Sequence, residues 1–261
     1  MDTYKLMQQA HFNRLNLMSD HLCDITSALK NESEIKQTEL YQYVLHDKFT
    51  ITLIDLSEGR YTFYSSAYKQ LFPVPSIDTS VPDNWNQTYH LIHPDDRYFA
   101  DNTDLMGYRY LMALPPEKRR LFEMIYMIRY KDGYGHYQAC LNRVYVWMND
   151  TKNNPWLLIC KTKQLPFCNT ENFQPYRQFC LFSEDTQQAV KHFEAYNTLE
   201  IKNVKLKILE IRAQQKTIEE TAALLFLSDK TIRNYDTEII RRLNVFNMAD
   251  AIYLATLLRI I

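Results

Sequence analysis

The spacing of apolar residues changes along the chain and predicts where helices give way to strands. Residues 1–45 carry leucines at roughly helical intervals and contain neither Pro nor Gly, which predicts an N-terminal helical segment. From residue 50, two short stretches rich in β-branched and aromatic residues flank the turn SEGR. Residues 50–65 are therefore expected to form a β-hairpin.

A helix and three longer strands are predicted next. The motif HPDD at 93–96 places a proline in a first helical turn and two aspartates at the positive end of the helix, which would run to about Leu114. Alternating apolar positions predict strands over 121–130, 136–148 and 156–162.

The first of these strands carries one strongly apolar face, which is expected to point at the helices and to bound any cavity. Its residues are Phe122, Met124, Tyr126 and Ile128. The turn KDGYG joins this strand to the next, and a positive φ is expected at both of its glycines, Gly133 and Gly135.

This order of elements resembles a PAS domain, and LIHPDDR at 91–97 followed by strand, KDGYG and strand carries the resemblance. It implies a PAS-like five-stranded antiparallel sheet over residues 46–165, with an α+β fold. The many tyrosines and methionines of 108–148 could line a pocket for a small-molecule ligand or could simply be core. Residues 166–198 are expected to be a connector with one helix over 184–196.

The chain after residue 198 has a helical pattern throughout, which predicts an all-α four-helix domain over 199–261. Thr217 and Glu220 have the spacing of a capping box at the start of a short second helix. Ser228 can cap a third helix over 229–243, and Asn247 can cap a fourth.

The third helix has two different faces. Ile232, Tyr235, Ile239 and Leu243 recur at helical spacing and are expected to face inward. The other side is cationic and amide-bearing, and arginine and asparagine can make paired hydrogen bonds to guanine and adenine. The candidate DNA-binding residues are Lys230, Thr231, Arg233, Asn234, Thr237, Arg241 and Arg242.

This stretch is similar to the LuxR-type (NarL-type) helix-turn-helix family. The similarity rests on TIEETAALLFLSDKTIRNY at 217–235 and the tail RRLNV at 241–245. It implies that Arg233, Asn234 and Thr237 contact bases. The chain departs from the family pattern in several places: Val204–Lys205 stand for Arg–Glu, Gln215 for Gly, Thr221 for Ile and Tyr235 for His.

Charge gives little support for DNA binding by one copy alone. The formal net charge of the chain is -1, and residues 199–261 carry ten lysines and arginines against eight aspartates and glutamates. Non-specific affinity is therefore expected to be weak, so a homodimer is expected on double-stranded DNA. The last helix is apolar nearly all round, and residues 248–261 are expected to pack against their two-fold mate.

The sequence lacks the residues that several classes of protein function require. The five cysteines form no CxxC pair, the four glycines leave no phosphate loop, and no nucleophile–base set can be assembled. Helix capping explains HPDD without a metal, and Cys140 and Cys160 are expected to be buried, inert thiols. No signal peptide or membrane span is predicted.

The sequence thus predicts a cytoplasmic, non-enzymatic transcription regulator without metal or resident cofactor. A PAS-like domain would sense a signal or mediate dimerisation and would control the helix-turn-helix. The alternative is a protein-interaction module in which the PAS-like domain binds no ligand. The two differ in whether the domain encloses a cavity that takes a molecule.

Overall fold

The computed structural model describes residues 31, 50–65, 72, 88–183, 189–196 and 201–261. The chain divides into two compact units. The first is Met1–Gln164 with Pro175–Tyr196, and the second is Leu165–Gln174 with Asn197–Ile261. Apart from residue 31, the helical segment expected over 1–45 lies outside the described residues.

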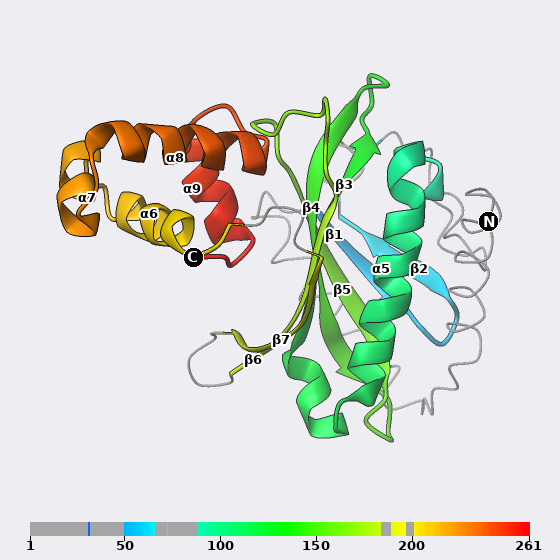
Figure 1. The fold of residues 1–261 in the computed structure, drawn as a ribbon. Coiled ribbons are helices and arrows are strands. Elements are labelled where there is room, and N and C mark those ends of the chain that lie inside the picture. The colour runs from blue at the N-terminus through cyan, green and yellow to red at the C-terminus, as the bar shows by residue number, and fades with distance from the viewer. Residues whose placement is uncertain (1–30, 32–49, 66–71, 73–87, 184–188, 197–200) are drawn as a thin grey trace, which may run out of the picture. The chain divides into compact units, whose positions relative to one another are not determined.

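The first unit is built on one antiparallel sheet with the strand order β2-β1-β5-β4-β3-β6-β7 (Figure 1). The strands are β1 (Thr50–Asp55), β2 (Arg60–Tyr64), β3 (Phe122–Lys131), β4 (Tyr137–Asn149), β5 (Pro155–Gln164), β6 (Tyr176–Phe182) and β7 (Ala189–Tyr196). The first five strands match the hairpin and the three long strands expected from the sequence. They confirm the PAS-like antiparallel sheet and the α+β class.

The sheet has seven strands where five were expected, because the predicted connector contributes two. Residues 189–196 form β7, so the helix predicted over 184–196 is wrong there, and 184–188 lie outside the described residues. Strand β6 pairs with β3 on one side and with β7 on the other, and all seven of its residues are buried. Pairing with a buried strand outweighs helical periodicity, since strand preference depends on the neighbours that a sheet provides.

Helix α5 (Pro94–Ala113) covers one face of the sheet (Figure 1). It begins where expected, with Pro94 in its first turn and the His93 side chain accepting a hydrogen bond from the backbone N–H of Asp95. It ends before two prolines and is followed by the short 3-10 helix η1 (Pro116–Leu121). Phe99 and Leu111 of α5 pack in one core cluster with alternate residues of β3, which forms the hydrophobic core between the helix and the sheet.

The turn between β3 and β4 differs from the prediction at one glycine. Gly135 has a φ of 90°, but Gly133 does not adopt a positive φ. One Asp132 carboxylate oxygen accepts hydrogen bonds from the backbone N–H groups of Tyr134 and His136, at 2.9 Å each. That carboxylate organises the turn, so a single left-handed residue is enough to reverse the chain.

The second unit contains the four predicted helices, α6 (Val204–Ala213), α7 (Ile218–Leu225), α8 (Asp229–Leu243) and α9 (Met248–Leu257). The expected caps are in place. Thr217 and Glu220 form the capping box of α7, and Ser228 and Asn247 cap α8 and α9. Their common core includes Ile208, Leu209, Ala222, Ile232, Ile239, Leu243, Ala251, Leu254, Ala255 and Leu258.

A short segment from earlier in the chain completes this unit. Residues 165–174 lie against the link between α8 and α9, where Cys168 forms a β-bridge with Val245. The side-chain amide of Asn244 donates a 2.6 Å hydrogen bond to the carbonyl of Asn169, and the Asn169 N–H returns one of 2.9 Å to the carbonyl of Asn244.

Candidate functional site

The link between α7 and α8 fixes how α8 is presented. Phe226 caps α7 in the left-handed conformation, with φ 55° and ψ 40°, and the N–H of Leu227 donates back to the carbonyl of Ala222 at 2.9 Å. Two residues later the Ser228 hydroxyl accepts from the N–H of Thr231. This gives a capped short helix, a three-residue turn and a capped longer helix, which is helix-turn-helix geometry.

The buried side of α8 differs by one residue from the prediction. It consists of Ile232, Asp236, Ile239 and Leu243, whereas Tyr235 is only half-buried. The helical spacing fits either position because steps of three and four alternate along one face. The spacing of apolar residues does not mark Asp236 as buried, and only its contact with α6 identifies it as such.

The predicted DNA-binding residues lie on the other side of α8. Lys230, Arg233, Asn234, Thr237 and Arg241 are exposed there. Thr231 and Arg242 are half-buried at its margin. The helix therefore brings together on one surface the groups that can contact base edges and phosphates.

Some of these groups already have partners within the unit. The Thr231 and Ser228 hydroxyl oxygens lie 2.8 Å apart, and the Thr237 hydroxyl donates to the carbonyl of Arg233 at 2.9 Å. Arg242 donates to a Glu238 carboxylate oxygen at 3.0 Å. The same oxygen accepts from Lys205 of α6 at 2.7 Å, so two cations share one carboxylate and the group keeps a net positive charge.

Two further ion pairs join α8 to its neighbouring helices. A terminal nitrogen of Arg233 lies 3.8 Å from a carboxylate oxygen of Glu219 on α7, and both side chains are mostly exposed. Asp236 lies 3.9 Å from Nε of Arg212 on α6. The other carboxylate oxygen of Asp236 is buried without a hydrogen-bond partner, as is Nε of Arg212. Burial raises the pKa of Asp236, although the positive charges of Arg212 and Arg233 oppose that rise.

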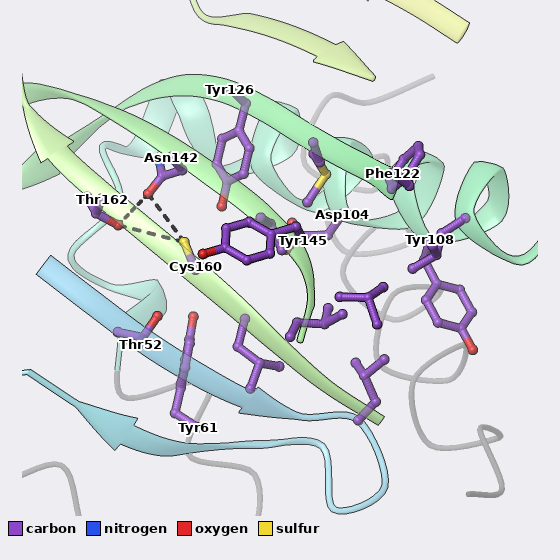
Figure 2. A pocket seen from close by; sticks show the side chains of 18 of the residues that line it. Thr52, Tyr61, Asp104, Tyr108, Phe122, Tyr126, Asn142, Tyr145, Cys160 and Thr162 are labelled. Carbon is purple, nitrogen blue, oxygen red and sulfur yellow. Dashed lines mark hydrogen bonds between the residues drawn. The ribbon is translucent and has the colours of Figure 1, made fainter. Parts of the chain in front are cut away.

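The first unit contains a cavity of about 80 Å³ between the sheet and α5 that is partly open to the surface (Figure 2). This volume exceeds the ~10–15 Å³ that a single water needs. A polar row formed by Tyr126, Asn142 and Thr162 crosses β3, β4 and β5. Farther along the same strands, Val146 and Leu158 form an apolar row with Ile54 of β1. The cavity thus has a polar side and an apolar side.

Asn142 is the most unusual polar residue of the cavity. It is fully buried, and its carbonyl oxygen accepts a 2.8 Å hydrogen bond from the Thr162 hydroxyl (Figure 2). Its amide nitrogen has no hydrogen-bond partner. Burial raises the pKa of Tyr126 well above its usual value of 10, so its hydroxyl stays protonated and able to donate. Two donors therefore belong to the polar row.

Three of the four residues predicted to bound a cavity do line it, namely Phe122, Met124 and Tyr126. Ile128 is buried in the same core but does not reach the cavity. Sequence reasoning missed Asn142, because one polar residue in a strand gives no signal of the face on which it lies. Cys140 and Cys160 are buried as expected, and burial raises the pKa of Cys160 to about 12, which keeps it a thiol.

The motif HPDD has a structural role. Oδ2 of Asp96 accepts hydrogen bonds from the backbone N–H and Nε of Arg129, at 2.8 and 3.0 Å, and Oδ1 accepts one from Nη2 at 2.8 Å. This ion pair joins the first turn of α5 to β3. Within the described part of the chain, no group of His, Cys, Asp and Glu residues is arranged to hold a metal ion.

Comparison with known proteins identifies a family for the C-terminal helices. Residues 205–255 match the family described as "Bacterial regulatory proteins, luxR family". No curated protein matches the chain. In the part of the chain that the structure describes, no helix is long and apolar enough to cross a membrane.

The chain is also similar to solved structures at low identity. A phage VqmA–DPO complex shares 11% identity, over 85% of this chain and 89% of that chain, with a TM-score of 0.35. A Vibrio cholerae VqmA dimer shares 14% identity, over 84% of this chain and 86% of that chain, with a TM-score of 0.32. A Rhodobacter sphaeroides LOV protein shares 10% identity, over 86% of this chain and 94% of that chain, with a TM-score of 0.36. Scores this low carry no argument about what this chain binds.

Proposed function

Because residues 205–255 form a helix-turn-helix domain of the luxR family of bacterial regulatory proteins, we propose that the chain is a transcription regulator that inserts α8 into the major groove of double-stranded DNA. The observation that carries the proposal is the exposed face of α8. Arg233 and Asn234 project from a helix whose start is fixed by the Ser228 cap and whose other side is anchored in the core.

We assign different roles to the residues of this face. Arg233, Asn234 and Thr237 contact base edges. The Thr237 hydroxyl can accept a hydrogen bond from a base while it donates to the carbonyl of Arg233, and it has to leave that carbonyl only to donate to a base. Lys230, Thr231, Arg241 and Arg242 contact phosphates and set the register on the duplex. Arg242 donates to Glu238 through Nε, so a contact with a phosphate would use its terminal nitrogens or replace that bond.

The test is a pair of variants of the full chain, measured on an operator selected by the wild type from random duplexes. Arg233→Ala should cost about 1–3 kcal/mol of discrimination at one base position. Arg242→Ala should weaken binding to every sequence about equally and flatten the salt dependence by roughly one unit. If Arg233→Ala binds the operator and its mutants with the selectivity of the wild type, the proposed role of α8 is wrong.

We further propose that the cavity of the first unit receives the signal. A compact ligand would place a hydrogen-bond acceptor at the Asn142 amide nitrogen and an apolar part against the Val146–Leu158 row. The unpartnered Asn142 nitrogen favours this function over an interaction module without a ligand, since a buried donor without an acceptor destabilises the fold. Native mass spectrometry of the chain should detect a bound small molecule that Asn142→Leu loses. A wild type that carries none in any preparation would favour the interaction module.

Two copies would bind one site. The second unit alone has a small excess of positive charge, so we propose a homodimer that pairs two α8 helices about one DNA turn apart. On α9, Tyr253 already contacts the ring of Phe167, at 5.4 Å between centroids, so part of the face assigned to the dimer is covered by residues of the same unit. As a regulator of DNA the protein would act in the cytoplasm and catalyse no reaction.

A further inference from the structure

Arg233 is flanked by two carboxylates on two different helices. Glu219, in the first turn of α7, has an oxygen 3.8 Å from a terminal nitrogen of Arg233. Asp236 lies three residues after Arg233 on α8, which places it about one turn along the same helix. Hydrogen bonds from its own backbone N–H and from the Thr217 hydroxyl lower the pKa of Glu219, and the charge of Arg233 adds a smaller effect in the same direction. Burial raises the pKa of Asp236, and the charges of Arg212 and Arg233 oppose that rise.

The four charged groups alternate in sign across three helices. The order is Glu219 on α7, Arg233 and Asp236 on α8, and Arg212 on α6. Arg233 therefore belongs to a series of charged groups that extends from the exposed surface into the core of the second unit.

The stability of the unit does not explain this arrangement. An exposed ion pair such as Glu219–Arg233 stabilises a fold very little. Asp236 is 8% exposed, yet one of its oxygens has no partner, and the other lies too far from Arg212 Nε for a hydrogen bond. Burial of such a carboxylate destabilises the folded unit, and groups of this kind are concentrated at functional sites.

We propose that Glu219 is a positioning residue that sets the sequence selectivity of DNA binding through Arg233. This inference rests on the proposed function, in which Arg233 contacts a base. The Glu219 carboxylate attracts the guanidinium towards one side, which suits a paired contact with guanine and disfavours adaptable contacts with phosphates.

Both carboxylates also repel the phosphates of every sequence. That repulsion is offset only where Arg233 meets its base, because DNA then excludes water and strengthens the interaction between Arg233 and Glu219. The network consequently weakens binding to non-specific DNA more than binding to the operator.

The experiment compares Glu219→Gln with the wild-type full chain on the selected operator, on an operator mutated at the Arg233 position and on random duplex. We expect tighter binding to random duplex with a salt dependence steeper by about one unit, since Arg233 becomes free to contact a phosphate. We also expect discrimination at the Arg233 position to fall about fivefold, the lower end of what one paired arginine–guanine contact provides.

Glu210→Gln is the matched control, because Glu210 is an exposed carboxylate on α6 and its loss changes the net charge equally. It should leave discrimination unchanged. Glu219 also lies at the positive end of α7, so a purely structural role would lower the melting temperature without altering discrimination. That result would overturn the inference.

The Arg233→Ala background separates this inference from the proposed function. There, Glu219→Gln should no longer affect discrimination, because the residue through which it acts is absent. An equal effect of Glu219→Gln in both backgrounds would contradict positioning through Arg233 and leave the DNA-binding assignment intact. If Arg233→Ala by itself changes nothing, both the base contact and the inference that rests on it are wrong.

Discussion

The ion pair between Asp96 and Arg129 should be the strongest single connection between helix α5 and the sheet. Asp96 is 1% exposed and accepts three hydrogen bonds from Arg129, and the Arg129 side chain is 11% exposed. Asp96→Ala would leave a largely buried guanidinium and one backbone N–H without these bonds. Removing one partner of a buried ion pair typically costs about 3–5 kcal/mol, a large part of the ~5–15 kcal/mol by which domains are stable.

The neighbouring aspartate provides a matched control. Asp95 is 77% exposed, and its carboxylate lies 3.6 Å from His93 and 3.8 Å from Arg129. Asp95→Ala should therefore cost less than about 1 kcal/mol. The two variants remove the same charge one residue apart in the same helical turn, so the difference between them isolates the buried contacts.

Urea unfolding of the full chain, followed by tryptophan fluorescence, measures this difference. All three tryptophans belong to the first unit, so the signal does not include unfolding of the second. The melting temperature of Asp96→Ala should also fall by roughly 6–20 °C, given about 2–4 °C per kcal/mol for a unit of this size. If Asp96→Ala is no less stable than Asp95→Ala, the assigned role of HPDD in joining α5 to β3 is wrong.

Three further predictions concern the cavity, the recognition helix and the dimer. In Gly107→Ala, the new Cβ would lie 2.5 Å from Met124 Sδ. Crowding should lower the free energy of unfolding by about 1–3 kcal/mol, which exceeds the gain of ~1 kcal/mol from helix propensity. The control Gly133→Ala adds a Cβ that meets nothing within 4 Å, so it should be neutral in the same urea assay. Because burial raises the pKa of Asp236, the ionised carboxylate makes folding less favourable above that pKa. Circular dichroism should therefore show a higher melting temperature for Asp236→Asn than for the wild type at neutral pH. The difference between the two melting temperatures should shrink as the pH falls towards ~4. Leu257→Asp should reduce cooperative binding of the full chain to the operator in sedimentation, and unchanged cooperativity would place the dimer interface elsewhere.

The helix-turn-helix could be predicted from the sequence almost to its ends because its signals are local. Thr217 and Glu220 have the spacing of a capping box, and Ser228 and Asn247 stand where caps are needed. Each of these residues bonds to a backbone group within a few positions along the chain. No knowledge of distant neighbours is required to expect them.

The features that the sequence did not reveal depend on distant partners. Residues 189–196 form a strand because β6 offers an edge, and β6 itself pairs with β3, some fifty residues earlier. Asp236 replaces Tyr235 on the buried side of α8, and the nearby charge of Arg212 comes from another helix. Asn142 lines the cavity because the register of β4 against β3 and β5 places it opposite Tyr126 and Thr162. Periodicity within one element contains none of this information.

The segment 165–174 limits how the protein could be recombined with others. Strand β5 ends at Gln164 and β6 begins at Tyr176, yet the residues between them belong to the helical unit, so the chain enters that unit twice. A chimera that joins residues 1–196 to a different effector would carry away the residues that bond to Asn244 and leave the helices without them. Exchange of the sensor therefore requires three junctions, after residues 164, 174 and 196, rather than one. We expect natural fusions of this architecture to inherit the sheet of the first unit and the helices α6–α9 together as one block.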